Sequence, residues 1–288
     1  MGHPFRAYVH GLAQLMAEAR SLPLGEWSPA PALEPSPEAP RVLVFSPHPD
    51  DESIIGALPL RLRRELRCDV QVVAVTQGSR ADRQAERFQE MLGACGFLGF
   101  GLIATQPNGL VNINPAARNS RPAEWAEAVG LIARVLVEQR PAMIFVPHAD
   151  DWNSTHIGTH RLLVDALQTL GPGFRCQVME TEFWRAMAEP NLLVESTPDE
   201  VADLVAAIAF HRGEVARNPY HLTLPAWMAD NVRRGGELVG GQGGSAPAFP
   251  FATLYRIRTW AQGGFEASVR PGQILDRNGN LAELFKTP

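Results

Sequence analysis

One short segment near residue 50 gathers side chains that could bind a metal ion. Residues 46–52, SPHPDDE, follow an apolar run and place His48 beside Asp50, Asp51 and Glu52, with no basic neighbour. Carboxylates gain from the positive end of a helix, so capping of a following helix would explain the acids alone. It does not explain the histidine, and like charges this close repel one another unless a cation compensates them. The segment therefore predicts a divalent metal ion.

A second histidine-rich segment, residues 147–160, also follows an apolar run and contains His148, His156 and His160. Imidazole and carboxylate ligands suit zinc, and three protein ligands with one open position for water are typical of a catalytic zinc. Because both segments follow predicted buried strands, we expect them to meet at the carboxyl edge of one sheet.

Strands and helices must alternate along residues 41–185 to position these segments. Short apolar, β-branched runs predict strands at 41–46, 69–76, 100–104, 142–147 and 174–184. Helical patterns lie between them, at 52–66, 81–95, 122–139 and 156–170. This alternation is typical of βαβ units, so we predict an α/β fold with a mostly parallel sheet and helices on both faces.

Two further segments flank this predicted core. Residues 1–40 combine a helical pattern with a proline-rich stretch, which predicts a helix followed by an extended surface arm. Residues 186–288 contain two more helical patterns, the first with a capping box at Thr197 and Glu200, and a final strand at 251–260. We expect this C-terminal extension to pack on the core and to form one wall of a pocket.

Composition argues against several classes of protein. The chain has 288 residues, is 45% hydrophobic and 20% charged, and carries a net charge of −5. These values suit one large globular domain with additions and argue against a nucleic-acid partner. No apolar run approaches the ~20 residues of a membrane-spanning helix, and no secretory signal pattern is present. The three cysteines are far apart and odd in number, so we expect a cytoplasmic protein without disulfides.

The segment His48–Glu52, after its apolar strand, resembles the HPDD signature of the zinc-dependent PIG-L/LmbE-like N-deacetylases. Further similarity lies in a T-x-G motif at 75–78, an R-x-x-E pattern at 87–90, and the segments 156–162 and 207–215. The resemblance covers residues 41–215 and implies a Rossmann-like fold, which agrees with the predicted alternation.

The resemblance also implies roles for single residues. His48, Asp51 and His156 match the protein ligands of one Zn²⁺ per chain, and Asp50 matches the general base. In the family, another histidine lies three residues before the last ligand and helps the developing oxyanion, whereas Asn153 holds that place here. An asparagine donates a hydrogen bond but cannot act as an acid or carry charge.

Two other histidines could supply the missing imidazole. His160 lies four residues after His156, on the same helix face, so it could replace that imidazole or be a ligand in place of His156. His148 is the other histidine that could supply the missing imidazole.

Three residues are candidates for substrate binding. Arg80 and Arg83 follow the T-x-G turn near the expected pocket mouth, and Asn108 replaces an aspartate that usually faces substrate in the family. For the two arginines, a solvated helix face is an equally good interpretation.

We therefore expect a metal-dependent amide hydrolase that removes an N-acyl group, in the first instance N-acetyl, from an amino sugar such as N-acetylglucosamine or a related glycoconjugate. Metal-activated water would attack the amide, with Asp50 as general base. Two rivals remain: a hydratase or lyase of a small unsaturated acid on the same scaffold, and a non-catalytic metal-binding module. The expected partner is a small N-acylated molecule, and the oligomeric state, a homo-oligomer included, is left open.

Overall fold

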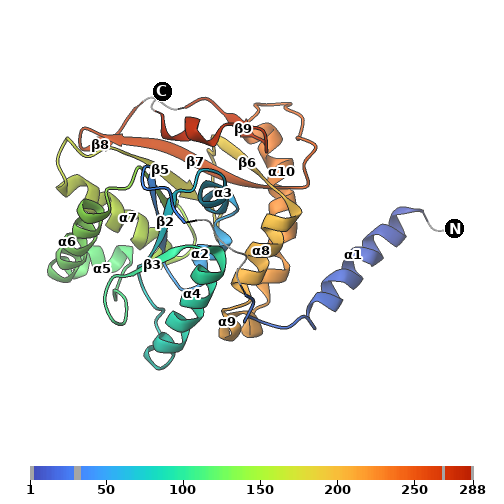
Figure 1. The fold of residues 1–288 in the computed structure, drawn as a ribbon, viewed down its shortest axis with the longest axis horizontal. Coiled ribbons are helices and arrows are strands. Elements are labelled where there is room, and N and C mark those ends of the chain that lie inside the picture. Colours follow the sequence, from blue (N-terminus) through green and yellow to red (C-terminus); the bar gives the residue numbers. More distant parts are fainter. Residues whose placement is uncertain (1–2, 29–33, 268–269, 287–288) are drawn as a thin grey trace.

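The structure is a computed structural model that describes residues 3–28, 34–267 and 270–286, so part of the predicted arm lies outside it. Figure 1 shows one central sheet with helices packed around it and α1 (Phe5–Ala19) reaching away from the body. The predicted helix at the start of the chain is thus present, and none of the described residues of α1 is buried. None of the described helices is both long enough and apolar enough to cross a membrane.

Five strands pair in parallel and carry the core: β1 (Arg41–Ser46), β2 (Asp69–Ala74), β3 (Gly101–Ala104), β4 (Met143–Pro147) and β5 (Cys176–Thr181). Their order across the sheet is β3-β2-β1-β4-β5, so the chain winds outward in both directions from β1. The prediction of a mostly parallel α/β sheet is confirmed. The strand order reverses between β1 and β4, and the carboxyl ends of strands at such a point form a crevice that binds ligands.

The remaining strands extend the sheet in mixed orientation. β7 (Phe251–Ala261) pairs antiparallel with both β5 and β6 (Leu192–Ser196). The short strands β8 (Gly264–Phe265) and β9 (Gln273–Leu275) pair with β7 and β6. The prediction that the strand at 251–260 is the last one is therefore wrong. β8 and β9 are too short to show the alternating apolar pattern by which strands are recognised.

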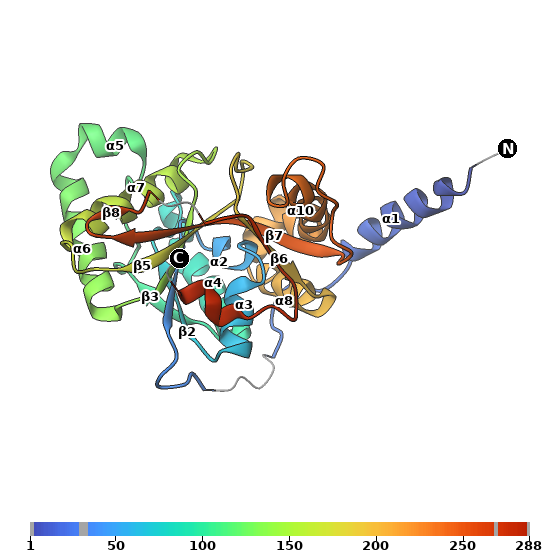
Figure 2. The same cartoon turned by 90° about the horizontal axis from the view of Figure 1, so that it is seen from above.

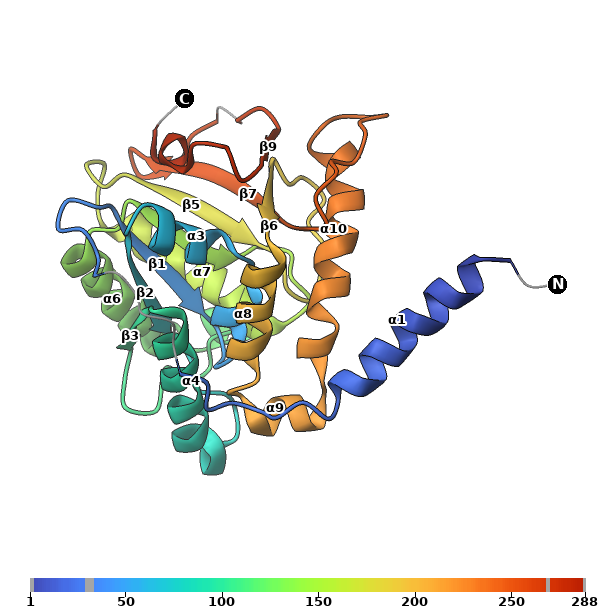
Figure 3. The same cartoon turned by 45° about the vertical axis from the view of Figure 1, so that its right-hand side comes forward.

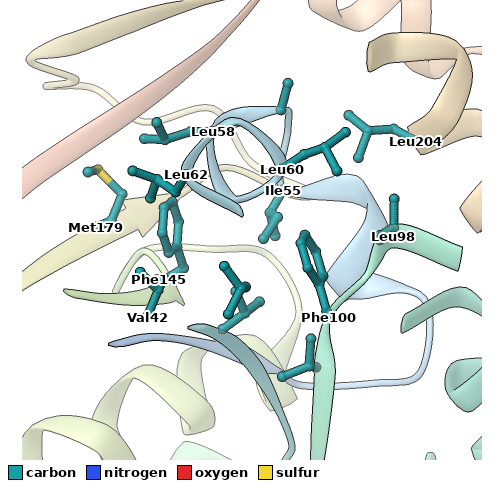
Figure 4. Close-up of a cluster of buried hydrophobic side chains, with 14 of the residues drawn as sticks. Val42, Ile55, Leu58, Leu60, Leu62, Leu98, Phe100, Phe145, Met179 and Leu204 are labelled. Carbon is teal, nitrogen blue, oxygen red and sulfur yellow. The ribbon is translucent and has the colours of Figure 1, made fainter. Parts of the chain in front are cut away.

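Helices cover both faces of the sheet, because alternate residues of each strand point to opposite sides. Val42 and Val44 pack with α2 (Asp51–Ile54), α3 (Leu58–Glu65), α4 (Gln84–Leu98) and α8 (Pro198–Ile208), and Figure 4 shows part of this core. Leu43 and Phe45 pack on the other face with α6 (Pro122–Gln139) and α7 (Ser154–Thr169). The short helix α5 (Pro115–Ser120) packs against α6 and α7.

The predicted helix at 52–66 is divided into α2 and α3 at Gly56. Gly56 has a φ of 85°, and a Cβ there would overlap Thr253 and Tyr255 of β7. Only glycine adopts this left-handed conformation at little cost, so the chain turns here and begins α3 anew. The break leaves α2 as a single turn directly after β1.

The C-terminal extension packs on the antiparallel part of the sheet. The capping box predicted at the start of α8 is present, with Thr197 and Glu200 each accepting the other's backbone N–H. The short helix α9 (Arg212–Arg217) follows, and α10 (Leu224–Leu238) packs against β7 and β6. Figure 2 shows α8 and α10 at the opposite end of the sheet from α5, α6 and α7, and Figure 3 shows α8 and α10 side by side.

Candidate metal centre

Three side chains from the carboxyl ends of two neighbouring strands converge at the switch point of the sheet. His48 follows β1, Asp51 begins α2, and His156 lies in the first turn of α7, which follows β4. One ligand atom from each lies within 4.8 Å of the other two. Asp51 Oδ2 lies 3.2 Å from both His48 Nδ1 and His156 Nε2. The structure therefore brings together the three residues that were expected to bind metal.

The environment of His156 fits a bound cation. The imidazole is fully buried, and among the described residues neither of its ring nitrogens has a well-aligned hydrogen-bond partner. Asp151 Oδ2 lies 3.8 Å from Nδ1, beyond hydrogen-bond distance. Buried polar atoms are rarely left unpaired, so a ring with two unsatisfied nitrogens indicates a missing partner such as an ion. Two imidazoles and one carboxylate form a donor set that suits zinc.

The charge state of Asp51 also suits a metal ligand. Burial alone would raise the pKa of this carboxyl, but the neighbouring imidazoles of His156 and His48 hold the pKa well below its usual range. Its Oδ2 also accepts the His48 backbone N–H at 2.9 Å. Because a carboxyl must be ionised to bind a metal, the site holds this ligand in the required form.

Asp50 lies beside the three converging side chains on a strained backbone, with a φ of 122°. Such a conformation costs on the order of 1–3 kcal/mol in a non-glycine residue and persists only where its surroundings hold it. Tyr220 Oη donates a hydrogen bond to Asp50 Oδ2 at 2.5 Å, and Arg87 Nη2 lies 3.8 Å from the same oxygen. Burial and the neighbouring charge of Asp51 raise the pKa of Asp50 to about 6, although His211, Arg87 and Tyr220 oppose this rise.

A buried ion pair between His211 and Glu52 holds the backbone of Asp50 in place. His211 Nε2 lies 2.7 Å from Glu52 Oε1, and both side chains are fully buried. The other oxygen of Glu52 accepts the Asp50 backbone N–H at 2.9 Å. Burial would lower the pKa of His211, but the charge and hydrogen bond of Glu52 outweigh it and raise that pKa above its usual value. The pair therefore fixes the backbone of Asp50 without contacting the cavity.

His48 and Asp51 lie at the wall of a cavity of about 690 Å³, together with Asp50. Its other lining residues are mostly polar or charged and include Thr76, Gln84, Arg87, Asn112, Asn114, Asn153, Glu214 and Arg217. Glu214 and Arg217 belong to the C-terminal extension, so that segment contributes to the wall. A cavity of this size and polarity can hold a small molecule with many hydroxyl groups.

Of the three candidates for the missing imidazole position, only Asn153 lines this cavity in the described part of the chain. Its Oδ1 accepts the Thr155 backbone N–H and so caps α7. His160 is buried, with Nε2 2.9 Å from Glu180 Oε1. His148 is buried as well, with Nε2 2.8 Å from the backbone oxygen of Arg185. The fold turns both histidines toward other partners.

The structure places the three expected substrate residues away from the cavity wall. Arg80 forms an exposed ion pair with Asp82 at 2.6 Å, and Asn108 is exposed in the loop after β3. Arg83 does not line the cavity, but its Nη1 lies 2.9 Å from Glu214 Oε1, and Glu214 does. Among the described residues, Arg87 and Arg217 are the arginines that line it.

Sequence reasoning did not find the contact between Tyr220 and Asp50. The two residues are 170 positions apart, so no local spacing could reveal it. The only available signal was the position of Tyr220 shortly after the segment 207–215, which resembles a family motif.

Comparison with known families confirms the resemblance. Residues 43–167 match the family model PIG-L, described as GlcNAc-PI de-N-acetylase. This range contains the three converging side chains and Asp50. No curated protein matches the chain by sequence.

Solved structures share the fold. A conserved protein from Thermus thermophilus is 23% identical, with a TM-score of 0.54 over 74% of this chain and 92% of that one. N,N'-diacetylchitobiose deacetylase from Pyrococcus horikoshii is 16% identical, with a TM-score of 0.56 over 91% and 94%. A 4-carboxy-2-hydroxymuconate hydratase from Pseudomonas putida is 17% identical, with a TM-score of 0.55 over 76% and 95%. At these identities the likeness concerns the fold alone.

Proposed function

Because residues 43–167 belong to the PIG-L family, we propose that this protein is a zinc-dependent hydrolase that removes an N-acyl group, in the first instance N-acetyl, from an amino sugar. N-acetylglucosamine and related glycoconjugates are the expected class of substrate. The family description supports an N-deacetylase. The observation that carries the proposal is the convergence of His48, Asp51 and His156, two of which line one polar cavity together with Asp50.

His48, Asp51 and His156 would hold one zinc ion per chain. When bound, such an ion lowers the pKa of water from 15.7 to ~7 and polarises the amide carbonyl. Asp50 then accepts the proton of the attacking water and delivers it to the leaving amine. The hydrogen bond from Tyr220 Oη and the backbone bond to Glu52 hold the Asp50 carboxylate at one place in the cavity.

Asn153 is the residue that we assign to the developing oxyanion. Its Oδ1 is engaged in capping α7, which fixes the side chain and leaves the amide nitrogen as a donor. A positioned donor of this kind stabilises a tetrahedral oxyanion more than it stabilises the planar amide. His160 lies behind the cavity wall against Glu180, so its proposed contribution is to position α7.

The cavity wall supports a sugar as the amine side of the substrate. Amide groups of Gln84, Asn112 and Asn114 and the carboxylate of Glu214 line it, and sugar hydroxyls pair with such groups. The cysteines Cys68, Cys95 and Cys176 are free and buried, which supports the proposal of a reducing, cytoplasmic location.

Hydration of a small unsaturated acid is the second candidate, favoured by the hydratase among the structural neighbours. One experiment separates the two. Purified protein is analysed for zinc by mass spectrometry and then incubated with a panel of N-acetylated amino sugars, with acetate and free amine measured in parallel. We expect one zinc per chain and equal amounts of acetate and amine. Zinc without acetate release, together with water addition to an unsaturated carboxylic acid, would contradict the deacetylase proposal.

A further inference from the structure

A small apolar hollow opens beside the polar cavity. Its volume is about 110 Å³, and its walls include Ile54, Phe183, Trp184, Tyr220, Leu224 and Trp227. These side chains come from α2, the loop after β5, the turn Tyr220–Leu222 and the start of α10. Its lining contrasts with that of the larger cavity, in which amide, hydroxyl and charged groups predominate.

The hollow adjoins the candidate reaction centre. Trp184 lines both the hollow and the cavity. Tyr220 lines the hollow, and its Oη donates to Asp50 Oδ2. The Phe183 ring, also in the hollow, meets the His156 ring edge-on with the ring centroids 4.8 Å apart. A group bound in the hollow is therefore separated by one side chain from the general base and from a metal ligand.

An N-acylated amino sugar has two chemically different sides that meet at the scissile amide. The sugar carries hydroxyl groups, which match the polar wall of the 690 Å³ cavity. The acyl chain carries only hydrocarbon beyond its carbonyl carbon, and it matches the apolar wall of the adjoining hollow. Trp184 remains 53% exposed between the two, so its ring is available to cover an acyl chain.

Building on the proposed deacylase function, we propose that this hollow is an acyl-chain subsite and that the enzyme prefers N-acyl groups longer than acetyl. A cavity of about 150 Å³ binds benzene, so a hollow of 110 Å³ suits roughly three to four carbon atoms beyond the carbonyl carbon. N-butanoyl is therefore the expected optimum, and longer chains extend past the hollow into solvent.

The test is a series of glucosamine derivatives that differ only in the acyl group: N-acetyl, N-propanoyl, N-butanoyl and N-hexanoyl. Amine release by the zinc-loaded enzyme gives kcat/KM for each. Each methylene buried is worth about 0.8 kcal/mol, so two methylenes predict roughly a tenfold higher kcat/KM for N-butanoyl than for N-acetyl. The phenyl glycoside of N-acetylglucosamine is measured in parallel. It carries its apolar group on the sugar, the amine side of the amide, and not on the acyl side.

Two substitutions in the hollow act in opposite directions. Thr223→Phe fills the hollow from an exposed position at its edge, and Trp227→Ala enlarges it. We expect the first to bring the butanoyl-to-acetyl ratio down to about one, and the second to move the optimum to N-hexanoyl. The matched control is Val137→Phe, which adds an aromatic ring at an exposed position of α6 far along the chain from the hollow. It should leave the ratio at its wild-type value.

Each outcome bears on the proposal. A flat acyl series in the wild type, unchanged in both hollow variants, overturns the subsite while the deacetylase function stands. A gain confined to the phenyl glycoside also overturns it, because it places the hollow on the amine side. If no derivative releases amine, the proposed function itself fails and the subsite fails with it. A butanoyl preference that Thr223→Phe abolishes and Val137→Phe retains supports it.

Discussion

Residues 46–52 and 147–160 follow neighbouring parallel strands and both place a histidine shortly before two aspartates, yet the fold uses them differently. In residues 46–52, His48, Asp50 and Asp51 all line the cavity, and Glu52 accepts the backbone N–H of Asp50. In residues 147–160, only one of three histidines joins the candidate metal centre. His148 and His160 instead contact the chain at and after β5.

The two segments differ in how far the directions of their side chains are set by neighbouring elements of the fold. The first is a turn between a buried strand and a one-turn helix, so its side chains have few directions available. In the second, His156 and His160 share a face of α7 but lie one turn, ~5.4 Å, apart along the helix. His156 meets Asp51 of α2, which follows β1, and His160 meets Glu180 of β5. Neighbouring strands therefore decide which imidazole can bind metal.

Substitution of His156 and of His160 should have the largest effects, and it tests which of the two binds metal. His156→Ala removes a proposed ligand, so we expect zinc affinity to fall by more than the ~100-fold typical of residues that only support a ligand, with loss of amine release. His160→Gln should retain zinc while lowering the free energy of unfolding by about 1–3 kcal/mol, because a buried hydrogen bond to Glu180 is weakened. Metal titration and urea unfolding measure these two quantities. Loss of zinc from His160→Gln with retention in His156→Ala would reverse the assignment.

Within the first segment, Asp50→Asn should separate metal binding from proton transfer. The amide keeps the size of the side chain and can still accept the Tyr220 hydrogen bond, but it cannot take a proton from water. We expect zinc content to stay at the wild-type level and kcat to fall roughly 10²- to 10⁴-fold, the contribution typical of a general base. Single-turnover amine release with an N-acetylated sugar, alongside metal analysis, provides the measurement. A fully active, zinc-loaded variant would show that another group is the base.

These differences also explain what the sequence could and could not predict. β1 is a continuous apolar run, and because alternate residues of a strand point to opposite sides, Val42 and Val44 face one layer of helices and Leu43 and Phe45 the other. The layered core therefore follows from the sequence alone. The convergence of the candidate ligands follows from their positions after parallel strands. The contact between Tyr220 and Asp50 could not be predicted, because only the packing of the complete fold brings these two distant residues together.

The substrate arginines illustrate the same limit. Arg83 and Arg87 lie four residues apart around the start of α4, and both are charged and polar by type. Only the packing of α9 against this region decides that Arg83 pairs with Glu214 and that Arg87 lines the cavity. The R-x-x-E pattern that begins at Arg87 resembles a family motif, but it does not show which of the two side chains lines the cavity.

In the second segment, Asn153→Asp should test the proposed oxyanion donor. The carboxylate retains the oxygen that caps α7 but lacks the N–H donor, so stability should change by less than about 1 kcal/mol. Loss of one such donor costs roughly 10²–10³ in kcat. Asn153→Ala is the matched variant that loses both cap and donor, and it should be less stable. Equal kcat for Asn153→Asp and wild type would remove this residue from the proposed mechanism.

The smallest expected effect is a displacement of the pH profile by Tyr220→Phe. Burial and Asp51 raise the pKa of Asp50 to about 6, and the hydrogen bond from Tyr220, which stabilises ionised Asp50, opposes this rise. Removal of that bond raises the Asp50 pKa, and because the base acts only when ionised, the acid limb of kcat/KM should move to higher pH by roughly one unit. The phenyl ring still lines the apolar hollow, so the preference for N-butanoyl over N-acetyl should persist. An unmoved acid limb would show that Tyr220 only packs against Asp50, whereas loss of the butanoyl preference would show that its hydroxyl also shapes the hollow.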